Sequence, residues 1–493
     1  MADTAMSALR ARLSATRITI IALLIAFAVG RTAILLGGRV FTTWDTFGYA
    51  YRTDQFYDRG PLVSFTGHAP RLWGTPLFMV MFPTDHARAI GMSVVGAIAW
   101  ALLALAVAGY LTRPAAKIAA VASILAVGLT PDVTNWDFSI MSEPLSISFG
   151  VLVLAALIRW LTNRSKVALV GGTLAAAWWT FMRPELGLLV AFVFVTIVFV
   201  GWRTRQWLAL GCAAVLAVSM LWVVAIMPTM SHTFTRYSAT GLSLNEETLA
   251  FRLRHVVLVT PAVKEVYEKD LGMPDCPPAD RVAKRKSYAT TPFGAAYRDC
   301  TALVAWGQKN AQSSGYRFAL DAPGLYTDVT WHMLPLSLAG ESIAHVPDPV
   351  PPVNKVVFPP QKYVVPGLLG GLLLAVGGAL VAGAWRRRRT MLLVTVGVAI
   401  ASAASTVAGL LYSAGELDRF GIQEAIGLRL ALLFSALLIV DVLLERYRQR
   451  RSRPAAATDG NTPSLPADAI DTLAHANGPG TVRTAPVGVF KTA

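Results

Sequence analysis

An aspartate follows the first long apolar segment of the chain, where the predicted helix leaves the membrane. Residues 18–36 are apolar except for Arg31, and the sequence WDTFGY at 44–49 places Asp45 just beyond them. A carboxylate in that position can take a proton from a hydroxyl group, which is general-base chemistry. Aspartate is also a preferred N-cap of helices. The sequence therefore leaves Asp45 two roles, a base or a helix cap.

Further carboxylates and arginines stand where other apolar segments begin or end. Glu143 opens one segment, and Arg419 precedes the last one. Arg183 and Glu185 flank the break between two segments. Arginine is suited to binding phosphate, and a carboxylate can hold a hydroxylated substrate. Each position also has a structural alternative: a helix start for Glu143, a helix break at Arg183 and Glu185, and a local ion pair for Arg419.

The composition is that of an integral membrane protein. Hydrophobic residues make up 54% and charged residues 15% of the 493 residues. A run of about 20 apolar residues crosses a bilayer as a helix. The sequence predicts an all-α membrane protein with about ten transmembrane helices, over residues 18–36, 89–111, 116–129, 143–161, 167–181, 186–202, 208–227, 364–385, 391–412 and 427–444.

Basic residues concentrate in alternate connections between these helices. They lie within residues 10–17, 113–117, 159–166, 203–205, 386–389 and 446–453. Such clusters mark the cytoplasmic side of membrane proteins, so the net charge of +15 does not indicate nucleic-acid binding. Both termini are predicted to be cytoplasmic, with the carboxylates named above outside. Arg31 lies about 20 Å along its helix, where it needs a partner, either a structural carboxylate or a lipid phosphate.

The charge pattern and the apolar runs divide the chain into five parts. They are a cytoplasmic N-terminus (1–17), helices 1–7 with the first outer loop at 37–88, which would be catalytic if Asp45 is a base (18–228), an extracytoplasmic region (229–363), helices 8–10 (364–445) and a basic, then disordered, cytoplasmic tail (446–493). We expect helices lying on the membrane in the first outer loop. The extracytoplasmic region has mostly helical patterns.

Two of the three cysteines, Cys276 and Cys300, fall in the extracytoplasmic region. An oxidising exterior permits a disulfide there, which contributes about 3 kcal/mol for a loop of this size. Two free thiols are the alternative. The sequence has no zinc-type spacing of cysteine and histidine, no phosphate-binding glycine loop and no Gly-x-Ser-x-Gly elbow. Zinc, P-loop and serine-hydrolase chemistry therefore have no support.

Several motifs resemble the GT-C superfamily of polyprenyl-phosphate-sugar-dependent glycosyltransferases. The first is the acidic residue and following tyrosine of the first outer loop, Asp45 and Tyr49. Similar stretches recur over most of the membrane part: HAPRLWGTP at 68–76, IMSEPL at 140–145, MRPE at 182–185 and DRF at 418–420.

The resemblance implies an inverting single displacement at the outer face of a bacterial plasma membrane. A sugar would move from a polyprenyl-phosphate donor to a cell-envelope glycan, glycolipid or protein, among membrane lipids. Asp45 would be the catalytic base, and the substrate-binding residues would be Tyr49, Asp54, Asp58, His68, Arg71, Glu143, Arg183, Glu185 and Arg419. No cofactor is required.

A divalent cation and two other functions stay open as alternatives. Many members of the superfamily carry paired acids, whereas Thr46 and Phe47 follow Asp45 here, so Asp54 or Asp58 would have to supply the second acid. A transporter or flippase of lipid-linked sugars is the main rival, although such proteins tend to show repeated halves, which this sequence lacks. An acceptor-binding subunit without activity would differ only in the role of Asp45.

Overall fold

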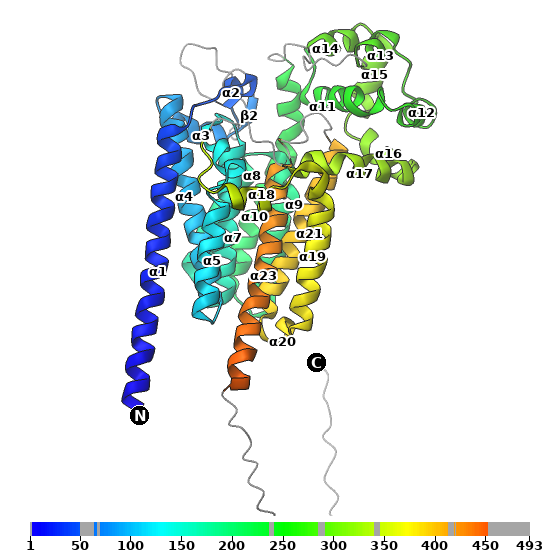
Figure 1. The fold of residues 1–493 in the computed structure, drawn as a ribbon. Helices are drawn as coiled ribbons and strands as arrows, with labels where there is room; N and C mark the ends of the chain where they lie inside the picture. Colours follow the sequence, from blue (N-terminus) through cyan, green and yellow to red (C-terminus); the bar gives the residue numbers. More distant parts are fainter. Residues whose placement is uncertain are drawn as a thin grey trace, which may run out of the picture. The chain divides into compact units, whose positions relative to one another are not determined.

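The computed structural model describes residues 2–49, 64–66, 70–235, 241–283, 291–339, 346–412, 419 and 421–451. Their regular structure is helical apart from one short antiparallel hairpin and one isolated bridge (Figure 1). The predicted class, an all-α membrane protein that crosses the bilayer several times, is confirmed.

Eight helices in the described part of the chain are long and apolar enough to cross a membrane. They are α1 (Ala2–Gly37), α4 (Asp85–Tyr110), α7 (Glu143–Asn163), α9 (Gly187–Arg203), α10 (Trp207–Phe234), α19 (Gln361–Val381), α21 (Arg389–Tyr412) and α23 (Ile422–Arg451). Eight of the ten predicted segments correspond to these helices.

The other two predicted segments form helices that are short for a bilayer. The segment 167–181 forms α8 (Lys166–Thr180), whose 15 residues extend about 22 Å, less than the hydrocarbon core of about 30 Å. The segment 116–129 forms α5 (Pro114–Val127), which bends by 60° into α6 (Pro131–Thr134) and η1 (Asn135–Phe138). This pair makes a ninth crossing if it is one broken span.

Local signals explain where several of these helices begin. The hydroxyl oxygen of Thr84 accepts a hydrogen bond of 3.1 Å from the backbone N–H of Ala87 and caps α4, and Ser165 caps α8 in the same way. Proline opens α5 and α6, where a missing N–H costs nothing. These caps set the ends of the helices, which is where the charged residues of interest stand.

The transmembrane helices pack around α7. One buried apolar cluster joins α7 to α1, α4, α5, α21 and α23, and a second joins it to α4, α8, α9 and α10. The connections α4–α5, α7–α8 and α9–α10, together with α20 (Ala384–Arg387), lie at one end of this bundle (Figure 1). These connections carry the basic clusters, so the fold gathers them at one end and leaves the starts of α7 and α23 at the other.

The described residues of the first outer loop are only partly helical. They contain α2 (Trp44–Tyr49), the antiparallel strands β1 (Ser64–Thr66) and β2 (Pro70–Leu72), and α3 (Gly74–Val80). Gly74 fixes the hairpin to the end of α8, because its N–H donates to the carbonyl of Phe181 at 2.9 Å. A Cβ at Gly74 would lie 2.7 Å from that carbonyl, so only glycine permits this approach.

The predicted extracytoplasmic region forms a small helical domain with its own core. It contains α11 (Leu244–Arg252), the π-helix η3 (Leu253–Val257), α12 (Pro261–Lys269), α13 (Pro277–Ala283), α14 (Thr291–Arg298), α15 (Thr301–Asn310), α16 (Ser314–Asp321) and α17 (Pro323–Ala339). Its core includes Cys276, which forms a disulfide with Cys300 across a Cα–Cα distance of 6.1 Å. The chain returns to the bundle through α18 (Pro351–Val357), which packs against α5.

Candidate functional site

Two arginines from distant parts of the chain bind the carboxylate of Asp45. Nη2 of Arg71 lies 2.8 Å from Oδ1, and Nη2 of Arg419 lies 2.5 Å from Oδ2. Asp45 stands in the first turn of α2, Arg71 on β2 and Arg419 just before α23. The side chain of Asp45 keeps 28% of its surface exposed. The structure therefore surrounds Asp45 with positive charge and leaves it accessible.

Aromatic rings hold the Arg71 guanidinium in place. Its Cζ lies 5.1 Å from the ring centroid of Tyr49 and 5.5 Å from that of Phe234, which are cation–π distances. Gly48 permits this approach, because a Cβ there would lie 2.9 Å from Nε of Arg71. The hairpin and α2 thus place Tyr49 and Arg71 together.

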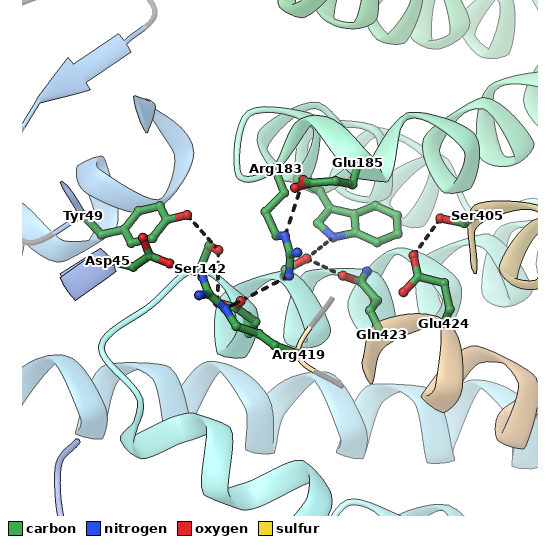
Figure 2. Close-up of polar contacts among 12 residues, drawn as sticks. Asp45, Tyr49, Ser142, Arg183, Glu185, Ser405, Arg419, Gln423 and Glu424 are labelled. Carbon is green, nitrogen blue, oxygen red and sulfur yellow. Dashed lines mark hydrogen bonds and ion pairs between the residues drawn. The ribbon is translucent and has the colours of Figure 1, made fainter. Parts of the chain in front are cut away.

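Glu143 forms the buried centre of the site. Its side chain is 0% exposed, and Oε1 is bound by Nε of Arg419 and lies 3.5 Å from Nη1 of Arg183. The hydroxyl of Ser142 lies 3.2 Å both from Oε2 of Glu143 and from the hydroxyl of Tyr49. Figure 2 shows how these groups lead from Asp45 and Tyr49 to Arg183. Since Glu143 is in the first turn of α7, the helix dipole also favours its charge.

Arg183 extends the cluster toward α9. Its side chain is 6% exposed, and Nε lies 3.6 Å from Oε2 of Glu185. The two residues flank Pro184, which ends the extended turn after α8 and begins the short 3-10 helix η2 (Pro184–Leu186). The predicted helix break is present, and it brings both charged side chains into the cluster.

The charges of the cluster shift the pKa values of its solvent-side groups. Burial raises the pKa of Asp45, but Arg419 and Arg71 lower it by more, so this pKa lies below its ordinary value. Burial raises the pKa of Tyr49, whose hydroxyl therefore stays protonated at neutral pH. Asp45 is thus an anion that can accept a proton, and Tyr49 is a neutral hydrogen-bond donor.

A second set of polar groups, which sequence reasoning missed, continues from Glu143 into the bundle. Ser146, one turn along α7, accepts a hydrogen bond of 3.3 Å from Nε1 of Trp179 and donates to the side-chain oxygen of Gln423. Oε1 of the neighbouring Glu424 accepts a hydrogen bond of 2.6 Å from Ser405 (Figure 2). The available signal was a Gln–Glu pair at the start of the last span, because polar residues in spans are costly.

An apolar cavity lies beside this second set. It holds about 590 Å³ of empty space, partly open to the surroundings, between α7, α8, α9, α21 and α23. Its walls are apolar except near Trp179, Ser402 and Gln423. Nε2 of Gln423 has no hydrogen-bond partner within the described structure, and a Cβ on Gly150 would lie 3.0 Å from it. The cavity therefore has one polar end, next to the charged cluster.

The remaining sequence predictions have different outcomes. Asp54, Asp58 and His68 lie outside the described residues. In the described part of the chain, no group of three His, Cys, Asp or Glu side chains is arranged to hold a metal ion. Arg31 pairs with Asp137 of η1 at 2.8 Å, and both side chains are 4% exposed. A structural carboxylate is therefore the partner of this arginine.

The site brings Asp45, Tyr49, Arg71, Glu143, Arg183, Glu185 and Arg419 together from separate segments. Three arginines and three carboxylates therefore form one ion-pair network beside an apolar cavity, and Asp45 is its partly exposed carboxylate. No family model, curated protein or solved structure matches this chain.

Proposed function

We propose that the protein is a GT-C-type glycosyltransferase of a bacterial plasma membrane. It moves a sugar from polyprenyl phosphate to a cell-envelope glycan, glycolipid or protein at the outer face. The observation that carries this proposal is the cluster of Arg71, Arg183 and Arg419 beside an apolar cavity within the helical bundle. A lipid phosphate matches both parts, since arginine binds phosphate and an apolar chain fills an apolar cavity.

The proposed reaction is a single displacement with inversion. The acceptor hydroxyl gives its proton to Asp45, and its oxygen attacks the anomeric carbon of the donor sugar. The bond from that carbon to the phosphate oxygen breaks, and polyprenyl phosphate leaves with the electron pair. Arg183 and Arg419 neutralise the departing phosphate, which is the largest electrostatic contribution expected of such a site. The chain's own residues supply each of these roles, so no cofactor is required.

Donor binding would also strengthen the base. Without substrate, Arg419 is shared between Asp45 and Glu143, and Arg71 also binds Asp45. A donor phosphate competes for these guanidinium groups. When these guanidinium groups bind the phosphate instead of Asp45, the pKa of Asp45 rises toward its ordinary value, because the positive charges that lower it have moved away. A stronger base then forms only when the donor is present.

The charge distribution supports an outer location for the site. Basic connections lie at the end of the bundle opposite to α2, the hairpin and the start of α7 (Figure 1). Positive residues favour the cytoplasmic side. The carboxylate and arginine cluster would then face lipid-linked donors on the extracytoplasmic side.

A transporter of lipid-linked sugars is the second candidate. The bent pair formed by α5 and α6–η1 and the buried pair Arg31–Asp137 favour it, because broken helices and intramembrane charges are common in transporters. The position of the arginine cluster favours the transferase instead, since Arg71 stands on the hairpin, and Arg183 and Arg419 stand at the starts of helices rather than in their middle.

The decisive experiment is Asp45→Asn in the purified protein with polyprenyl-phosphate sugar donors. A base that cannot accept a proton should lower turnover by about 100-fold or more. Donor binding should persist, because the arginines remain and lose a competing carboxylate. The exposed Asp321→Asn on α16 is the matched control. Full turnover in Asp45→Asn would rule out Asp45 as the base, and loss of donor binding would make its role structural.

A further inference from the structure

One face of α11 leads away from the charged cluster. Leu244, Glu247 and Phe251 follow one another at intervals of three and four residues, which places them on the same side of α11, and Arg254 follows in η3. Leu244 packs against the apolar group that contains Leu72, the residue after Arg71. This face therefore begins beside the hairpin that carries Arg71.

A backbone contact fixes the start of α11 against the bundle, because the N–H of Asn245 donates to the hydroxyl of Ser231 on α10 at 3.1 Å. Burial lowers the pKa of the Arg71 guanidinium, whereas Tyr49, Asp45 and, more weakly, Glu247 raise it above its ordinary value. Glu247 is thus close enough to Arg71 to act on its charge.

A pocket opens farther along this face. It is half open to the surroundings, and its empty volume of about 340 Å³ includes that open space. Phe251 and Phe293 supply aromatic walls, Gly294 leaves one side without a side chain, and Glu247 and Arg254 supply the charged groups.

The backbone is unusual at the pocket. The N–H of Leu258 donates to the carbonyl of Leu253 at 2.8 Å, which is the five-residue spacing of a π-helix. Such turns are rare and occur frequently at functional sites. Arg254 lies within this turn, is only 4% exposed and still lines the pocket. The irregular turn therefore coincides with a buried charge that faces a cavity.

We propose that this pocket binds a sugar ring of a saccharide acceptor, so that the acceptor is a glycan whose reactive end reaches Asp45 along the α11 face. Aromatic walls suit the apolar faces of a sugar ring. A carboxylate and a guanidinium accept from and donate to its hydroxyl groups. Because the pocket carries one negative and one positive group, it has no strong preference for an anion or for a cation. The inference rests on the proposed transferase function, because only that function requires the reactive end of the acceptor to reach Asp45.

Saturation-transfer NMR with the purified full-length protein in lipid nanodiscs tests the pocket. The probes are methyl α-mannopyranoside, methyl β-galactopyranoside and methyl α-arabinofuranoside, which cover pyranose and furanose rings. At least one should bind the unchanged protein, and Phe251→Ala should weaken that binding about tenfold, the effect of losing one aromatic contact. Glu247→Gln should weaken it similarly while keeping the shape of the side chain.

The matched control is Tyr316→Ala on α16, which removes a 55% exposed ring outside the pocket and should leave glycoside binding unchanged. A thermal melt of each variant shows whether it is folded. Absence of binding for all three probes, or unchanged binding in both Phe251→Ala and Glu247→Gln, would overturn the inference. Sugar transfer measured on the same samples separates the two proposals. Pocket binding without any transfer would refute the transferase alone, whereas transfer with no effect of either variant on glycoside binding would refute the pocket alone.

Discussion

Arg419→Gln removes the cation that joins the two central carboxylates. In the structure, its guanidinium binds Oε1 of Glu143 and lies 2.5 Å from Oδ2 of Asp45. Breaking a buried ion pair by removing one partner costs about 3–5 kcal/mol. Glu143 is fully buried, but Arg183 remains 3.5 Å from it, so we expect the lower figure, about 3 kcal/mol. The melting temperature should fall by several degrees.

The same change should alter the pH dependence of turnover. The pKa of Asp45 lies below its ordinary value of about 3.9, with Arg419 the strongest of the charges that lower it. A depressed carboxylate pKa stabilises the folded protein above the unfolded pKa, and that contribution is lost as the pH falls through the folded pKa. Without Arg419 the folded pKa rises. The acid limb of kcat/KM should therefore move to higher pH, and kcat/KM at neutral pH should fall about 100-fold, as after losing one transition-state donor.

The assay is kcat/KM for sugar transfer from a polyprenyl-phosphate donor between acid and neutral pH, together with a melting curve. Arg298→Gln, an exposed arginine on α14, is the control for charge removal and should change neither measurement. An acid limb that stays in place while stability falls would show that Arg419 only supports the fold. A limb that moves to lower pH would contradict the electrostatic argument itself.

Three further predictions concern topology and stability. A cysteine at Lys269, which is 70% exposed on α12, should react with a membrane-impermeant maleimide on intact cells, whereas a cysteine at Arg389 should not; the reverse pattern would place the site in the cytoplasm. Cys276→Ser should destabilise the α11–α17 domain by about 3 kcal/mol, and alkylation of both thiols without a reductant would disprove the bridge. Arg31→Gln alone should cost about 3–5 kcal/mol, and a second change, Asp137→Asn, should recover part of that loss. Unaltered melting in Arg31→Gln would show that the pair does not stabilise the bundle.

Much of the fold follows from local properties of the sequence. Apolar runs and alternating basic connections predicted the long helices and the end of the bundle at which each charged residue stands. The break between Arg183 and Glu185 was also predicted from the local sequence. Such signals act within one or two turns of a helix. They therefore predict each helix by itself and not the helices that it packs against. This is why eight predicted spans match long helices, while the 15 residues of α8 form a helix too short to cross alone.

Contacts between distant elements could not be predicted in the same way. No local pattern sets Asp137 apart from other carboxylates of the chain, and only the bend after α5 brings it to Arg31. The first outer loop was expected to be helical, yet residues 64–66 and 70–72 form paired strands, because packing against the end of α8 outweighs a weak local preference. Gln423 carries no charge and was not predicted to be a site residue, although it lines the cavity. Its importance depends on neighbours that the sequence does not specify.

The two central carboxylates differ in burial, and that difference separates their roles. Glu143 is 0% exposed, its Oε1 faces two arginines and its Oε2 lies 3.2 Å from a hydroxyl, so a substrate hydroxyl has no route to it. Asp45 is 28% exposed on a short helix outside the bundle and shares Arg419 with Glu143. A fixed anion behind the arginines holds them in position whether or not substrate is bound, which is the preorganisation that electrostatic catalysis requires. In the proposed reaction, Asp45 can then share Arg71 and Arg419 with a phosphate without the cluster collapsing, because Glu143 keeps its contact with Arg183 at 3.5 Å.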